Sequence, residues 1–211
     1  QLDAGFDSAS GFRAAFARLF GHPPHRMRQP SDLLADWIDT PLGGMIAIAD
    51  DHALHLLEFI DRKALPEGLR RLSGFVGRRI GLGRTAVHDL TEAQLGAYFA
   101  GKGARLDVPV ALHGTPFQQQ VWQALRTIPA GETRSYAQLA AGIGRPTATR
   151  AVARANATNR LALVVPCHRV IGADGTLTGY AGGLWRKEKL IGIERGYARR
   201  DSWVDGPAGI L

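Results

Sequence analysis

The hydrophobic positions in the first half of the chain follow two different spacings. Residues 45–49 and 53–60 are dense in apolar side chains and are separated by Asp50-Asp51, a pattern that predicts two strands joined by a hairpin turn. From residue 65 to residue 76 the apolar positions recur every third or fourth residue, which predicts a helix with one buried face. That face consists of Leu65, Leu69, Leu72 and Val76. Strands and a helix in one short stretch are typical of an α/β domain.

Two further elements complete this region, which we place between residues 29 and 112. Thr91-Glu-Ala-Gln94 has the spacing of a capping box and predicts the start of a helix that Gly101 ends. Residues 106–112 predict an edge strand, because Pro109 within them has no N–H to donate. The histidines are scattered and suit surface or core positions better than metal ligation; they are His52, His55 and His88. We find no motif with chemistry here and expect a small α/β domain.

A strong helix start opens the second domain, which we place between residues 113 and 200. Thr115-Pro-Phe-Gln118 combines a capping box with a proline at the first helical position. We expect this helix to end at Pro129 and to bury one apolar stripe. The stripe consists of Phe117, Val121, Trp122, Leu125 and Ile128.

Two short helices separated by a glycine turn are predicted next. Residues 135–141 form the first, residues 142–144 the turn and residues 145–155 the second, which is the spacing of a helix-turn-helix. In such motifs the second helix contacts DNA, and here it carries Arg150 and Arg154 one turn apart. A basic face exposed only to solvent would give the same pattern.

The one cysteine of the chain, Cys167, stands between Pro166 and His168. Residues 161–165 are all apolar and predict a short buried strand that Pro166 ends. The thiolate is the reactive form of cysteine, and His168 and Arg169 could both lower the thiol pKa. A lone cysteine can also be a small buried hydrophobe. A zinc site would need about four ligands, and the sequence near Cys167 does not supply them.

Composition limits the classes of function. The hydrophobic content of 45% fits a globular protein, and no apolar run approaches the ~20 residues of a membrane span, so we expect no membrane association. The net charge of +7 favours an acidic partner such as nucleic acid. A single cysteine excludes an internal disulfide, which favours a reducing cytoplasm.

The N-terminal residues 1–28 resemble part of an AraC-type regulator. Phe12, Phe16, Leu19 and Phe20 have helical spacing, and Gly21 with the following prolines ends the helix. The sequence is similar to the last helix-turn-helix of that family, while the partner motif that precedes it there is missing. We therefore expect a packing element rather than a promoter-binding module. Residues 201–211 are expected to form a C-terminal tail.

Six segments from residue 117 onward together resemble the O6-alkylguanine-DNA alkyltransferase family, in particular its adaptive-response (Ada-type) members, which join an AraC-type regulator to a repair module. The segments are Phe117-Gln-Gln-Gln-Val-Trp-Gln-Ala-Leu-Arg-Thr-Ile-Pro129, Gly131-Glu-Thr-Arg-Ser-Tyr136, Arg150-Ala-Val, Asn159, Pro166-Cys-His-Arg-Val170 and Gly179-Tyr180. The resemblance implies a small ribonuclease-H-like α/β domain followed by a winged-helix-like DNA-binding domain that carries the cysteine. It also implies suicidal repair, in which an alkyl group passes from a flipped base to the protein's own cysteine.

The resemblance assigns the chemistry to a few residues. Cys167 is the nucleophile, His168 the base that acts through a bridging water, and Tyr136 the donor of a hydrogen bond to the leaving guanine. Asn159 lies in the link before the cysteine, where its side chain can bond turn amides. Glu194 is expected on a helix from 184 to 197, on the core side, where its carboxylate must be paired. It would orient His168.

DNA contacts are assigned to the residues around the helix-turn-helix and the cysteine. The resemblance makes Arg150 the residue that enters the base stack in place of the flipped base. We assign further DNA contacts to Ser135, Arg145, Arg154 and Arg169. The expected partner is double-stranded DNA containing O6-alkylguanine, bound through the minor groove by a monomer.

The substrate pocket is expected to include Tyr136, Val170, Thr178, Tyr180 and Ala181. Ala181 stands where a hydroxyl residue often follows the pocket tyrosine in the family, and Thr178 stands where some relatives have glycine. We therefore expect a narrow pocket that prefers methyl to bulky adducts, with O6-methylguanine and O4-methylthymine as substrates.

Four other functions are weighed against alkyl transfer. A cofactor-dependent methyltransferase would need a glycine-rich nucleotide loop, for which Gly81-Leu-Gly83 is too short, so we expect no cofactor. A cysteine hydrolase would turn over, whereas an alkylated cysteine has no route back. A lesion-binding protein without transfer would not need the nucleophile. A transcriptional regulator of the alkylation response would need the missing part of the AraC-type region.

Overall fold

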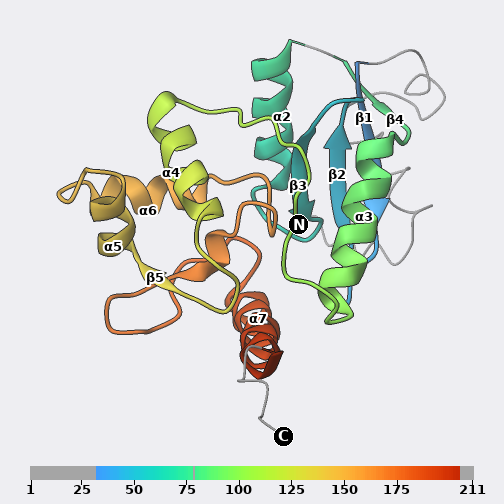
Figure 1. The fold of residues 1–211 in the computed structure, drawn as a ribbon. Coiled ribbons are helices and arrows are strands. Elements are labelled where there is room, and N and C mark those ends of the chain that lie inside the picture. The colour runs from blue at the N-terminus through green and yellow to red at the C-terminus, as the bar shows by residue number, and fades with distance from the viewer. Residues whose placement is uncertain (1–31, 78, 205–211) are drawn as a thin grey trace, which may run out of the picture.

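The computed structural model describes residues 32–77 and 79–204 (Figure 1). The prediction for residues 1–28 lies outside the described residues. The predicted start of the tail at residue 201 is wrong, because the last helix continues to Val204; the rest of the tail lies outside the described residues. Within those residues, no helix is long and apolar enough to cross a membrane.

A four-stranded sheet forms the first half. Its strands are β1 (Leu33–Ile38), β2 (Met45–Ala49), β3 (Leu54–Phe59) and β4 (Ile80–Leu82), in the spatial order β3-β2-β1-β4. β2 and β3 form the predicted antiparallel hairpin, whereas β4 pairs parallel to β1 after a crossover through α2 (Leu65–Val76). β1 and the three-residue β4 were not predicted from the sequence. The mixed α/β class is as expected.

Both faces of the sheet are covered, which explains why β2 and β3 are apolar almost throughout. α2 packs on one face through the predicted residues Leu65, Leu69 and Leu72. α3 (Ala86–Phe99) and the second half of the chain pack on the other face. Figure 1 shows α2 and α3 on opposite sides of the sheet.

Two expectations for this half are wrong. α3 begins at Ala86, because Thr85 and His88 form the capping box, while Thr91 lies inside the helix and its hydroxyl donates to the Val87 carbonyl. Residues 106–112 form no strand; a single bridge joins Val110 to Leu54. Pro109 cannot donate to a continuous ladder, and the segment passes along the sheet edge as coil.

The second half is helical around a two-stranded sheet. Its elements are α4 (Pro116–Arg126), β5 (Arg134–Ser135), α5 (Tyr136–Gly142), α6 (Thr149–Ala157), the 3-10 helix η2 (Cys167–Arg169), β6 (Val170–Ile171) and α7 (Leu184–Val204). β5 and β6 pair in parallel.

α4 starts at the predicted capping box. α6 begins four residues later than predicted, because Pro146 and its neighbours form a turn. α7 starts as predicted and continues beyond residue 197.

Candidate active site

The predicted strand at residues 161–165 is wrong: this apolar run is a buried turn. Leu161 makes one bridge to Leu57 of β3, and Leu163 has a φ of +66°. Asn159 closes the turn. Its Oδ1 accepts from the Leu161 N–H at 2.9 Å, and its Nδ2 donates to the Val165 carbonyl at 2.8 Å. The same Nδ2 lies 3.1 Å from the sulfur of Cys167, so the residue that shapes the turn also contacts the thiol.

Cys167 opens η2 and is 8% exposed. Burial raises the pKa of its thiol, because a thiolate loses hydration there. The hydrogen bond from Asn159 and the positive charges of Arg62 and Lys187 act in the opposite direction. His168 and Arg169 were the residues predicted to lower the thiol pKa. In the structure the charges come instead from Arg62 and Lys187, which lie 105 and 20 positions from Cys167 along the chain.

His168 and Arg169 both bond to Glu194 of α7. His168 Nε2 lies 2.8 Å from Glu194 Oε1, and Arg169 donates Nε and Nη2 to the two carboxylate oxygens at 2.9 and 2.8 Å. Tyr98 of α3 and the Gly131 N–H also donate to this carboxylate. Glu194 thus contacts His168 as expected. The assignment of Arg169 to DNA is wrong, because its guanidinium is buried and bonded inside the protein.

The charge state of Glu194 fixes the tautomer of His168. Burial would raise the carboxyl pKa, but the hydrogen bonds and charges of His168 and Arg169 lower it to about 2, so the group is ionised. An ionised carboxylate only accepts hydrogen bonds, and His168 Nε2 must therefore carry the proton. In the neutral form of the ring, Nδ1 is then the nitrogen without a proton. It is buried and has no hydrogen-bond partner among the described residues.

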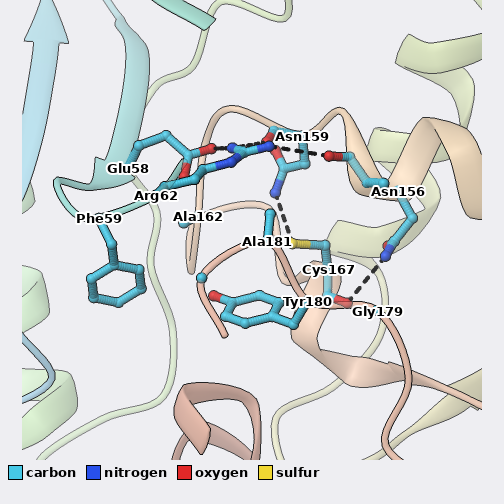
Figure 2. Close-up of a pocket in the computed structure, with 12 residues that line it drawn as sticks. Glu58, Phe59, Arg62, Asn156, Asn159, Ala162, Cys167, Gly179, Tyr180 and Ala181 are labelled. Carbon is cyan, nitrogen blue, oxygen red and sulfur yellow. Dashed lines mark hydrogen bonds and ion pairs between the residues drawn. The ribbon is translucent and has the colours of Figure 1, made fainter. Parts of the chain in front are cut away.

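A pocket of about 320 Å³, counted out to its open mouth, leads to the sulfur (Figure 2). Its lining comes from both halves of the chain: Glu58, Phe59, Arg62, Asn156, Ala157, Asn159, Ala162, Cys167, Gly179, Tyr180, Ala181 and Gly182. Tyr180 and Ala181 lie in this wall as predicted. The Tyr180 hydroxyl is buried and has no partner among the described residues, and burial raises its pKa well above the ordinary value.

The other predicted pocket residues lie around this wall. Tyr136 is half-buried at the start of α5; burial raises the pKa of its hydroxyl, and the side chains of Thr178 and Asn156 oppose this shift. Val170 is fully buried and is not part of the pocket lining. Lys187 links these parts, because its buried Nζ donates to the carbonyls of Val170 and Thr178, both at 2.5 Å. Burial lowers the pKa of Lys187 to about 8.

The residues predicted to contact DNA lie on α5, α6 and the turn between them. Arg145, Arg150 and Arg154 are exposed. Ser135 is the N-cap of α5, where its hydroxyl accepts from the Gln138 N–H at 3.1 Å. The guanidinium of Arg145 lies over the ring of Phe117, 5.7 Å from its centroid. These side chains offer a basic surface, and their contacts with DNA stay a prediction.

Several site residues were missed in the sequence. Arg62 and Glu58 come from the half in which no chemistry was found. Asn156 lies one residue beyond the predicted second helix of the helix-turn-helix, and Lys187 lies on the helix where only Glu194 was given a role. One signal was available: Glu58 is a carboxylate inside an apolar strand, and Arg62 follows four residues later. A buried carboxylate needs a partner, which indicated a buried pair but not its location.

Comparison with known proteins places this geometry in a family. The profile described as "6-O-methylguanine DNA methyltransferase, DNA binding domain" matches residues 116–196. A methylated-DNA–protein-cysteine methyltransferase of Mycolicibacterium paratuberculosis is 44% identical over 164 residues, covering 75% of this chain and 90% of the relative. One from Salmonella typhimurium is 46% identical, covering 75% and 94%.

A solved structure agrees with the sequence relatives. The crystal structure of Mycobacterium tuberculosis OGT in complex with DNA superposes with a TM-score of 0.67 at 41% identity, covering 76% of this chain and 92% of that one. The likeness spans both the sheet and the helical half that holds the cysteine. The chain belongs to the family of methylated-DNA–protein-cysteine methyltransferases.

Proposed function

We propose that the protein repairs DNA by direct reversal, taking the alkyl group of O6-methylguanine, and of O4-methylthymine, onto Cys167 in a single turnover. The observation that carries this proposal is the position of the thiol. Cys167 lies at the pocket, bonded to Asn159 and next to a His168–Glu194 pair, inside a family named for this transfer.

The reaction follows from the charges of the site. The thiol of Cys167 loses its proton to Nδ1 of His168 through a bridging water, and Glu194 stabilises the imidazolium that forms. The sulfur then bonds to the methyl carbon while the bond from that carbon to the base oxygen breaks. Tyr136 donates a hydrogen bond to the leaving base, which lowers the barrier by stabilising its negative charge. These steps need no cofactor.

DNA binding uses the basic surface of α5 and α6. Arg145, Arg150 and Arg154 are exposed there, and the family profile that matches this region is named for DNA binding. We infer minor-groove binding, with the damaged base flipped into the pocket and Arg150 in the space it leaves. We further propose a ribonuclease-H-like first domain, a winged-helix-like second domain, a monomer, and the bacterial cytoplasm as location.

The pocket favours small adducts. Tyr180, Gly182 and Phe59 crowd its wall: a methyl group on Gly182 would stand 2.8 Å from the Tyr180 ring and 3.0 Å from that of Phe59. We therefore propose a preference for methyl over benzyl groups. Rapid reaction with free O6-benzylguanine would contradict this preference.

The test is intact mass measurement after mixing the protein with excess oligonucleotide that contains O6-methylguanine. We expect one added methyl per chain, and peptide mapping should locate it on Cys167. A bound oligonucleotide without a mass change would indicate a lesion-binding protein instead. Turnover beyond one equivalent would contradict the irreversible mechanism. Cys167→Ala is the control, since it should bind DNA and gain no methyl.

A further inference from the structure

Arg62 brings a charge from the first half of the chain into the site. It follows β3 and precedes α2, yet its side chain is only 9% exposed and lines the pocket that leads to Cys167. Figure 2 shows its guanidinium between Glu58 and the turn that carries Asn159. A buried guanidinium is costly unless it is paired and hydrogen-bonded, so its contacts indicate what holds it there.

Those contacts join three parts of the protein. Glu58 forms an ion pair with Arg62 from within β3. On the other side, Nη1 donates to the Asn159 carbonyl at 3.0 Å and Nη2 donates to the Ala157 carbonyl at 3.1 Å. Ala157 is the last residue of α6, where carbonyls lack helical partners and a cation is favourable. Arg62 therefore clamps the end of α6 and the Asn159 turn to the sheet.

The clamp reaches the cysteine through Asn159. Asn159, held by Arg62 through its carbonyl, presents its side-chain amide to the sulfur at 3.1 Å. The charge of Arg62 also opposes the effect of burial on the pKa of Cys167. Lys187 is the other cation that acts on the thiol, but its Nζ bonds two carbonyls and burial lowers its pKa to about 8. Burial lowers the pKa of Arg62 too, but the ordinary pKa of arginine is so high that the guanidinium keeps its charge at any pH the protein meets.

We propose that Arg62 is a positioning residue for alkyl transfer, which fixes the Asn159 turn against Cys167 and keeps a positive charge beside the sulfur while it is anionic. This inference rests on the proposed function. The thiol gives up its proton, the sulfur bonds to the alkyl carbon, and the base leaves with the electron pair of the broken bond. Arg62 stabilises the thiolate, which exists after the proton has left and before the sulfur bonds to carbon, because only the thiolate carries a negative charge.

The test separates the charge from the clamp with two variants. Arg62→Met removes both, whereas Arg62→Lys keeps the charge but loses the planar fork that bonds two carbonyls at once. Arg160→Met is the matched control: Arg160 is also partly buried and donates to a backbone carbonyl, that of His113 at 3.0 Å. Two rates are measured for each protein, methylation of Cys167 by methyl iodide as a function of pH and methyl transfer from the oligonucleotide.

We expect Arg62→Met to slow both reactions by roughly threefold or more at pH 7, with the methyl iodide rate returning to the wild-type value at high pH, where the thiol is ionised in every variant. Arg62→Lys keeps the charge but loses the bonds that hold Asn159 at the sulfur, so it should displace the methyl iodide profile less than Arg62→Met and still transfer slowly from DNA. Arg160→Met should change neither rate.

A wild-type pH profile for Arg62→Met would overturn the proposal, because a merely structural role would leave the ionisation of the thiol unchanged. If Arg62→Met does not fold, a wild-type rate of transfer from the oligonucleotide for Arg62→Lys overturns the clamp. Failure of the proposed function looks different: the wild-type protein would react with methyl iodide and take no methyl from DNA.

Discussion

Replacing Glu194 with glutamine tests the most densely bonded group of the site. Glutamine keeps the shape but removes the charge that compensates Arg169, whose guanidinium is 8% exposed. Leaving one partner of a buried ion pair uncompensated costs about 3–5 kcal/mol. The lowering of the Glu194 pKa from 4.5 to about 2 corresponds to roughly 3 kcal/mol, which agrees in order of magnitude. For a chain of this size that loss lowers the Tm by about 10 °C.

Urea unfolding at pH 7 provides the assay, with Glu67→Gln as the control. Glu67 also bonds two arginines, Arg70 and Arg71, but on the exposed surface of α2. Solvent screens those pairs, so the control should change stability little. A Glu194→Gln protein that loses less than about 1 kcal/mol would refute the reasoning, because the network would then be no stronger than a surface pair.

Three further predictions concern pH, the turn and the DNA surface. Folding lowers the pKa of Glu194, so the stability that this carboxylate contributes is complete above about pH 4.5 and is lost as the pH falls toward 2. The urea midpoint of the wild type should therefore drop between these pH values, and that of Glu194→Gln should drop less. Asn159→Leu removes the amide from the sulfur and should slow methyl transfer at pH 7 more than at pH 9; equal slowing at both would contradict the role in ionisation. Arg150→Ala should weaken binding to oligonucleotides and reduce its salt dependence by about one counterion, with methylation of Cys167 by methyl iodide unchanged.

Local signals in the sequence predicted the elements that depend on a few neighbouring residues. The β2–β3 hairpin and the starts of α4 and α7 were found because a turn or a cap is specified within about four positions. The same reasoning failed where two nearby threonines could each have capped the helix. Thr91 had the spacing of a cap, but Thr85 with His88 makes the cap that also lets His88 reach the Ala47 carbonyl in the sheet.

The sequence by itself predicted the contact between His168 and Glu194 and the burial of residues 161–165, because motif spacing and apolar patterning are properties of the chain. Only the tertiary structure decided that this apolar run is a turn, since burial does not specify backbone conformation. It also placed Arg169 inside the protein and Arg62 at the thiol. Arg62 meets Asn159 across 97 positions of sequence, and such a contact depends on how the two halves pack against each other. Local pattern carries no information about which distant carbonyl a buried charge will bond.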